Sequence, residues 1–174
     1  MKYLISFLFL ALAFSMKSEA KVTLPSILGD NMVLQQQAEV KLWGKARPNA
    51  TVTVKTSWNG QTYKFSSDGK GGWSLTVSTP VAGGPYKIIF NDGELLTLQN
   101  VLIGEVWFCS GQSNMEMPMG CFDRQPVRGA NDIIAKAKPS TPIRMYTTDS
   151  KDGRWVRQFS KTPAEDCQGE WLEN

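Results

Sequence analysis

The chain has 174 residues, with 19 Lys and Arg against 16 Asp and Glu, three cysteines and no histidine. A net charge of only +3 gives no electrostatic basis for binding nucleic acid or an anionic membrane. Three cysteines are too few for a disulfide scaffold, and without histidine or any zinc-ligand spacing we expect no metal site and no cofactor.

Residues 1–20 have the pattern of a signal peptide. A lysine precedes the apolar run 3–14, and Ser18 and Ala20 place small residues before a cleavage point at Lys21. The run is short for a bilayer span. We therefore predict export to the periplasm or the cell exterior, with no membrane span after cleavage.

The next eighty residues, 21–100, are rich in short strand patterns separated by turn residues. Alternation of polar and apolar residues and β-branched composition predict six strands, at residues 38–44, 50–58, 61–65, 73–77, 86–90 and 94–98. Asn59-Gly60 is a strong two-residue hairpin signal. This spacing favours a small antiparallel β-sandwich.

Three tryptophans of this region have two interpretations. Trp43, Trp58 and Trp73 lie in the predicted strands, where exposed indoles would stack on sugar rings and buried ones would fill the core. We favour the core, because large aromatic side chains dominate the interiors of small β domains.

The pattern changes near residue 101. Residues 101–109 form a nearly unbroken apolar strand, of the kind buried on both faces in α/β proteins. A helix is expected over 130–139, with Asn131 or Asp132 near its N-cap and Pro139 at its end, followed by a strand over 142–149. Strand, helix and strand open an α/β domain.

Residues 101–174 are too few to complete that domain. A doubly wound domain takes roughly 100–150 residues, and the last twenty residues are polar and aromatic without a clear terminating element. We therefore predict that the second domain is truncated.

The cysteines and methionines near the second domain's start leave alternatives open. Cys109 is either a buried free thiol in an apolar strand or the partner of Cys121, and Cys167 is the odd third cysteine. The alternating Met115, Met117 and Met119 are better interpreted as an apolar lining of a turn than as soft metal ligands.

The stretch "WFCSGQSNMEMPMG" presents a serine directly after the predicted apolar strand. Ser113 would lie in the crevice at the carboxyl end of a strand, and Gly111 would allow a close backbone approach. Gln112 and Asn114 supply amides that orient a carbonyl or hold the turn. Position 115 is Met, so the G-x-S-x-G elbow is absent. The alternative is an ordinary loop that caps a helix. It stays open because a serine acts as a nucleophile only when a base accepts its proton, and the chain contains no histidine.

Several segments resemble the sialate O-acetylesterase family of the SGNH (GDSL-like) hydrolase superfamily. "VLIGEVWFCSGQSNMEMPM" resembles its nucleophile block, and "GEWLEN" resembles a segment inside its catalytic domain. The segments that resemble its N-terminal β domain are "LPSILGDNMVLQQ", "VKLWGKARPNATVTV", "GGWSLTV" and "AGGPYKIIF". Together they cover essentially the whole chain after the predicted signal peptide.

The resemblance implies a β-sandwich over residues 21–100, followed by the start of a flavodoxin-like, three-layer SGNH domain over residues 101–174. It implies that Ser113 attacks the acetyl carbonyl of an O-acetylated sialic acid or related sugar, with its own backbone N–H as an oxyanion donor. The family's base is a histidine in an Asp-x-x-His block, which this chain lacks. The resemblance therefore predicts an N-terminal fragment that is inactive by itself. A sugar-binding or interaction module without catalysis, and an acetylxylan-type esterase, are the alternatives.

Overall fold

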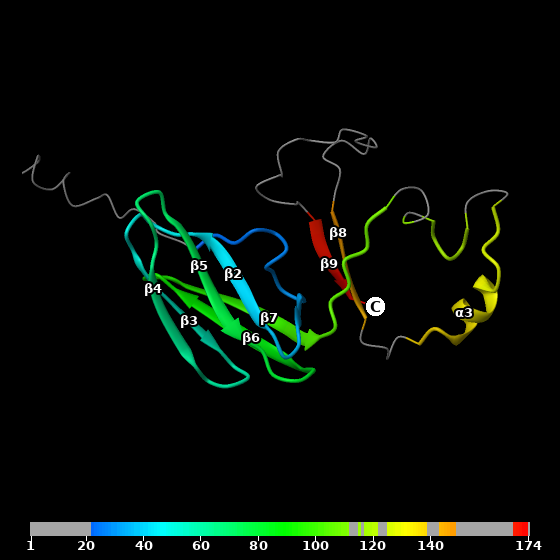
Figure 1. Ribbon diagram of the computed structural model, residues 1–174, viewed down its shortest axis with the longest axis horizontal. Coiled ribbons are helices and arrows are strands. Elements are labelled where there is room, and N and C mark those ends of the chain that lie inside the picture. Colours follow the sequence, from blue (N-terminus) through cyan, green and yellow to red (C-terminus); the bar gives the residue numbers. More distant parts are fainter. Residues whose placement is uncertain are drawn as a thin grey trace, which may run out of the picture.

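The computed structural model describes residues 22–111, 115, 117–121, 125–138, 143–148 and 169–173. Within these ranges the protein consists mostly of β-strands with one short helix. A pair of sheets occupies one end of the molecule, and an extended region carrying the helix and a two-stranded hairpin occupies the other (Figure 1).

The larger sheet has five strands in the order β1-β7-β6-β3-β4. Their bounds are Val33–Gln35 for β1, Leu95–Gly104 for β7, Gly83–Asn91 for β6, Thr51–Thr56 for β3 and Thr62–Ser66 for β4. All neighbours pair antiparallel except β1 and β7, which are parallel. The smaller sheet pairs β2 (Glu39–Lys45) with β5 (Gly72–Ser78) antiparallel, and these two strands lie in front of the larger sheet (Figure 1).

The two sheets share one hydrophobic core. Leu42 of β2 and Val77 of β5 are fully buried against residues of the larger sheet such as Val54 and Phe90. Trp73 completes the contact, with its ring 5.7 Å from that of Phe90. The alternating pattern that predicted the strands therefore indicates which side chains point into this core. The six predicted strands are confirmed as β2 to β7.

A hairpin does form at Asn59-Gly60, but its loop is longer than the two residues predicted. It joins the paired strands β3 and β4, whose last paired residues are Lys55 and Thr62. Thr56 N donates a hydrogen bond to the Gln61 backbone oxygen, so residues 57–60 form the loop, in which Gly60 has a positive φ of 68°. The Asn59 side-chain oxygen accepts hydrogen bonds from Gln61 N at 3.0 Å and Thr56 Oγ1 at 2.6 Å. A side chain therefore satisfies groups that the tight turn leaves without ladder partners.

The predicted apolar strand over 101–109 is wrong in its second half. Residues 101–104 belong to β7 of the larger sheet, and residues 105–110 have no regular structure. Trp107 and Phe108 are 83% and 94% exposed. The reason is that β6 and β1 supply pairing partners for β7 as far as Gly104, whereas the described residues provide no strand beside the segment that follows.

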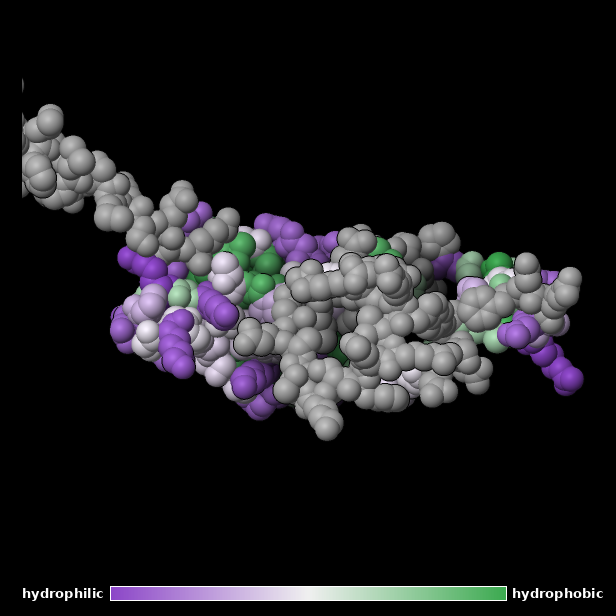
Figure 2. Space-filling model, turned by 90° about the horizontal axis from the view of Figure 1, so that it is seen from above, coloured by the Kyte–Doolittle hydropathy of each residue, from purple (hydrophilic) through white to green (hydrophobic). Residues whose placement is uncertain are grey.

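The helix and the final strands differ in detail from the prediction. Helix α3 spans Ala130–Lys136, with Gly129 rather than Asn131 or Asp132 as its N-cap, and it ends before Pro139. Its Ile133 and Ile134 are exposed, and Figure 2 shows hydrophobic side chains at the surface of the end that carries α3.

The strand predicted over 142–149 is confirmed as β8 (Arg144–Thr148). It pairs antiparallel with β9 (Gly169–Glu173), which the sequence pattern did not reveal. In the described part of the chain, no helix is long and apolar enough to cross a membrane.

The core assignment can be tested with matched valines. Val54 is fully buried and Val81 is 62% exposed. We expect Val54→Ala to lower the free energy of unfolding by about 2–3 kcal/mol, because it removes two buried methyl groups and leaves a cavity. Val81→Ala should stay within about 0.5 kcal/mol of the parent chain. Urea unfolding followed by circular dichroism measures both, and equal effects would contradict the assignment of the core.

Candidate active site

The predicted nucleophile Ser113 lies outside the described residues, as do its neighbours Gln112 and Asn114. Gly111, at the near end of this motif, is described and exposed. A Cβ atom at Gly111 would lie 2.7 Å from Cγ of Met115, closer than ordinary van der Waals contact. Any side chain at position 111 would therefore force Met115 to move.

The segment that leads to this motif is fastened where β7 ends. The carboxylate of Glu105 accepts hydrogen bonds from Gln36 Nε2 at 2.6 Å and Gln35 Nε2 at 3.2 Å. Gln35 Oε1 in turn accepts the backbone N–H of Val106 at 2.9 Å. Two consecutive glutamines at the end of β1 thus hold the first residues beyond β7. Sequence reasoning missed this network, although "VLQQ" and "GEVW" were both among the resembling segments.

These hydrogen bonds change the acidity of Glu105. The amide donor of Gln36, and to a smaller extent that of Gln35, favour the charged carboxylate and lower the Glu105 pKa below its ordinary value of 4.5. The network is therefore complete when Glu105 is ionised.

A second anchor joins the β8–β9 hairpin to the pair of sheets. Arg144 of β8 donates from Nη1 to the backbone oxygens of Asn31, at 3.0 Å, and Asn100, and from Nη2 to Asn100 Oδ1 at 2.8 Å. Asn31 and Asn100 both have positive φ, of 64° and 55°, which asparagine tolerates better than most residues. The Asn100 side-chain amide also donates to Asn31 Oδ1 at 2.8 Å. One guanidinium therefore binds two segments that are already bonded to each other.

Aromatic residues extend this contact. The hydroxyls of Tyr146 and Ser26 are 2.8 Å apart in a hydrogen bond, and Trp171 Nε1 donates to the Ile27 backbone oxygen at 2.9 Å. The Tyr146 and Trp171 rings are 5.4 Å apart, and Trp171 packs against the core. The segment "LPSILGDNM" thus contacts the hairpin, and the segment "GEWLE" contributes the indole of Trp171 to this contact.

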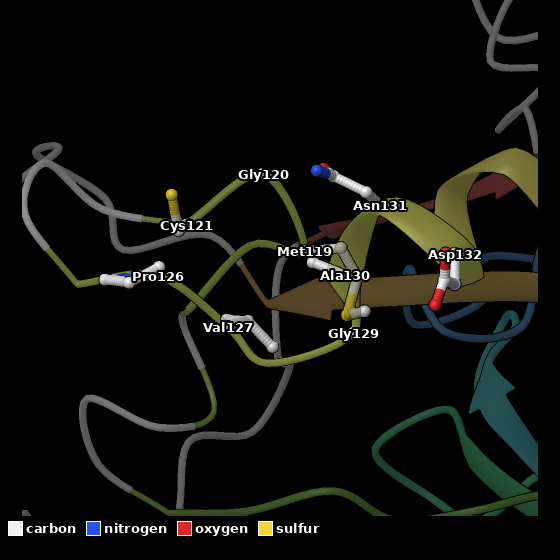
Figure 3. A pocket seen from close by; sticks show the side chains of 9 residues that line it. All are labelled: Met119, Gly120, Cys121, Pro126, Val127, Gly129, Ala130, Asn131 and Asp132. Atoms are coloured by element: carbon white, nitrogen blue, oxygen red, sulfur yellow. The ribbon is translucent and has the colours of Figure 1, made fainter.

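An open hollow of about 480 Å³ lies between the loop around Cys121 and the start of α3. Its lining residues are Met119, Gly120, Cys121, Pro126, Val127, Gly129, Ala130, Asn131 and Asp132. Figure 3 shows the side chains of Cys121 and Asn131 projecting on one side, whereas Asp132 points the opposite way. The hollow supplies a thiol, an amide and a carboxylate, but these groups do not converge on one point.

The structure decides the alternatives for two of the cysteines. Cys109 and Cys121 are both free and exposed. The interpretation of Cys109 as a buried thiol is wrong, because β7 ends five residues before it and the following segment lies at the surface. Cys167 lies outside the described residues. Of the three alternating methionines, Met119 lines the hollow, and Met115 is exposed.

The tryptophans divide between core and surface. Trp73 is buried, and Trp58 donates its indole N–H to the Ser78 backbone oxygen at 3.0 Å while meeting Tyr86 edge-on. For these two residues the core interpretation is confirmed. Trp43 is 38% exposed on the outer face of β2.

No family model matches the chain. Sialate O-acetylesterases from Pongo abelii and Homo sapiens are each 34% identical to it over 105 residues, and that from Mus musculus is 34% identical over 102. Each alignment covers 53% of this chain and about a fifth of the relative. The crystal structure of a carbohydrate acetylesterase from Xanthomonas citri matches with a TM-score of 0.72 and 29% identity, over 88% of this chain and 32% of that one.

The sequence comparison and the structure comparison thus both find similarity to carbohydrate esterases. More specifically, they confirm the resemblance to the sialate O-acetylesterase family that the motifs indicated. The chain spans about a fifth of the length of the curated relatives it matches, which fits its interpretation as a fragment.

The Glu105 network predicts a specific pH dependence. Because the folded-state pKa is depressed, the stabilisation by this carboxylate is complete above pH 4.5 and is lost as the pH falls through the lower folded value. We expect the carbon-13 signal of the Glu105 carboxyl to titrate below pH 4.5, and Gln36→Ala to move the midpoint upward.

Gln99→Ala is a matched control, since this exposed side chain forms no hydrogen bond with the described residues. A Glu105 midpoint that Gln36→Ala leaves in place would contradict the network.

The Arg144 contact predicts the behaviour of the hairpin. Hydrogen bonds to a charged group contribute about 1.5–3 kcal/mol, so Arg144→Ala should accelerate amide hydrogen exchange in β8 and β9 by roughly 10- to 100-fold. Arg128→Ala, which removes an exposed arginine without a partner in the described residues, should leave that exchange unchanged. Unaltered exchange in Arg144→Ala would show that the guanidinium does not hold the hairpin.

Proposed function

We propose that the chain is the N-terminal part of an exported carbohydrate esterase that removes O-acetyl groups from sialic acid or a related acetylated sugar. The observation that carries this proposal is the match to a carbohydrate acetylesterase structure over 88% of the chain. Residues 22–104, the pair of sheets, are less than half of the chain, so this match necessarily includes residues of the second region as well. The 34% identity to sialate O-acetylesterases supports the choice of substrate class.

In this proposal, residues 1–20 are a signal peptide. The β-sandwich extends past the predicted boundary at residue 100 to the end of β7 at Gly104, and the residues that follow are the beginning of a three-layer SGNH domain. Ser113 is the nucleophile and Gly111, Gln112 and Asn114 shape its turn. The Glu105 network supports this arrangement, because it fixes the chain eight residues before the serine to the end of a buried strand. A site held by a rigid element is positioned better than one on a free loop.

The reaction would proceed in two steps. Ser113 Oγ attacks the acetyl carbonyl carbon, the bond from that carbon to the sugar oxygen breaks, and the serine proton is passed by a base to the departing sugar hydroxyl. Water then attacks the acetyl-enzyme and releases acetate while the proton returns to Oγ. The backbone N–H of Ser113 stabilises the oxyanion in both steps.

The base is the missing part. The 174 residues contain no histidine, and hydroxyl nucleophiles depend on a neighbouring group that accepts the proton. The 174-residue chain should therefore hydrolyse O-acetyl esters no faster than its Ser113→Ala variant.

The experiment compares the product of the full reading frame, translated to its natural stop codon, with its Ser113→Ala variant. Hydrolysis of O-acetylated sialic acid should fall on the order of 10⁶-fold in kcat, as expected when a triad nucleophile is removed. Ser110→Ala, a neighbouring exposed serine, should retain kcat within a few-fold. Turnover that survives Ser113→Ala, with folding confirmed by circular dichroism, would overturn the assignment of the nucleophile.

A further inference from the structure

The outer face of the β2–β5 sheet presents an unusual set of side chains. Alternation along each strand places Leu42 of β2 and Val77 of β5 in the core, and it places the side chains of their neighbours in the same strand on the outer face. Five of these outward residues form a surface that we call the Trp43 face: Lys41, Trp43 and Lys45 of β2 together with Ser74 and Thr76 of β5. The register pairs Trp43 with Ser74 and Lys41 with Thr76, so the five residues adjoin one another across the two strands.

The indole of Trp43 is available to a ligand. It is 38% exposed, and its cross-strand neighbour is the small Ser74. Trp43 forms no ring contact or side-chain hydrogen bond with the described residues, unlike Trp58, whose indole N–H is bonded, and Trp73, which is buried in an aromatic cluster. More than a third of Trp43 is therefore accessible, and its ring has no aromatic or hydrogen-bonding partner among the described residues.

The two charged side chains that flank the indole along β2 are both positive. Lys41 and Lys45 are exposed, lie two residues on either side of Trp43, and form no ion pair with the described residues. Two residues along a strand span roughly 6.6 Å, so both flexible ammonium groups reach the space above the indole. Glu39 lies two residues beyond Lys41 on the same side of β2, and its carboxylate accepts a hydrogen bond from Oγ of Ser78, its cross-strand partner.

We propose that the Trp43 face binds an anionic glycan. The apolar face of a sugar ring stacks on the indole, a carboxylate on that sugar lies between Lys41 and Lys45, and the hydroxyls of Ser74 and Thr76 exchange hydrogen bonds with sugar hydroxyls. A sheet face with one exposed aromatic ring and short hydroxyl side chains matches a pyranose ring, which is apolar on its faces and polar at its edge. The positive charges of Lys41 and Lys45 favour pyranose sugars that carry a carboxylate.

This site is separate from the Ser113 region. It lies on β2 and β5, whereas the segment leading to Ser113 is fastened to β1 and β7 of the other sheet. Glycan binding here needs no general base and does not rest on the proposed esterase activity.

The test is a titration of the nitrogen-15-labelled 174-residue chain with 3′-sialyllactose, using lactose as the neutral probe. The indole signal of Trp43, identified by its absence in Trp43→Ala, should shift on addition of 3′-sialyllactose. Trp43→Ala should weaken binding at least tenfold, measured from the remaining backbone signals of β2 and β5. The double variant Lys41→Gln/Lys45→Gln should weaken 3′-sialyllactose binding about tenfold and leave the weaker lactose binding unchanged.

The matched control is Lys55→Gln/Lys64→Gln, which removes two exposed lysines from the paired strands β3 and β4 of the other sheet. It should leave binding unchanged. Absence of any shift, equal affinity of the parent chain for both probes, retained binding in Trp43→Ala, or an equal loss in the control double variant would each overturn the proposal. Thermal unfolding of every variant verifies that the fold is intact.

Discussion

The pairing of β7 with β1 is the constraint on which the rest of the structure depends. Their parallel register places Leu34 opposite Ile103 and Gln35 opposite Gly104. That register brings Gln35 and Gln36 to Glu105, the first residue after β7, and it brings the Asn31 turn to Asn100 within β7. The anchor of the Ser113 segment and the anchor of the hairpin are therefore consequences of one strand alignment.

Burial fixes this alignment. Leu98, Val101 and Ile103 of β7 are buried, while Gln99 is exposed and Leu102 is only partly covered. A slip of one residue would turn the buried set outward and expose side chains that each contribute about 1.5–3 kcal/mol by burial. The polar contacts of Asn100 and Glu105 need not specify the register themselves, because the core has already done so.

The sequence predicted the elements whose stabilising contacts are local or regularly patterned. Strands β2 to β7 were found because alternation marks the buried face. The hairpin was found because Asn59-Gly60 marks a turn, although its loop is longer than those two residues. β1 was missed because three residues carry little pattern and its partner lies about seventy residues away. β9 was missed because a pairing with β8 and the insertion of Trp171 against Ile27 hold it, not its own composition. The apolar run 101–109 was misjudged because hydrophobicity does not reveal where strand partners end. Of the candidate site, the motif around Ser113 was visible in sequence, but the Glu105 network joins residues that only the fold brings together.

The Arg144 contact shows why a polar group, not another apolar side chain, joins the hairpin to the sheets. Backbone carbonyl groups that leave the solvent need hydrogen-bond donors, and the Asn31 and Asn100 oxygens, at two positions with positive φ, accept from Arg144. A guanidinium is a rigid fork with several donors, so Arg144 satisfies the Asn31 and Asn100 oxygens together and does so only when the two segments are correctly placed. An apolar side chain would tolerate many positions of the hairpin, whereas this contact permits one. The larger sheet thereby holds the second region through β7 and the turn before β1. The smaller sheet takes no part in that contact and carries the Trp43 face.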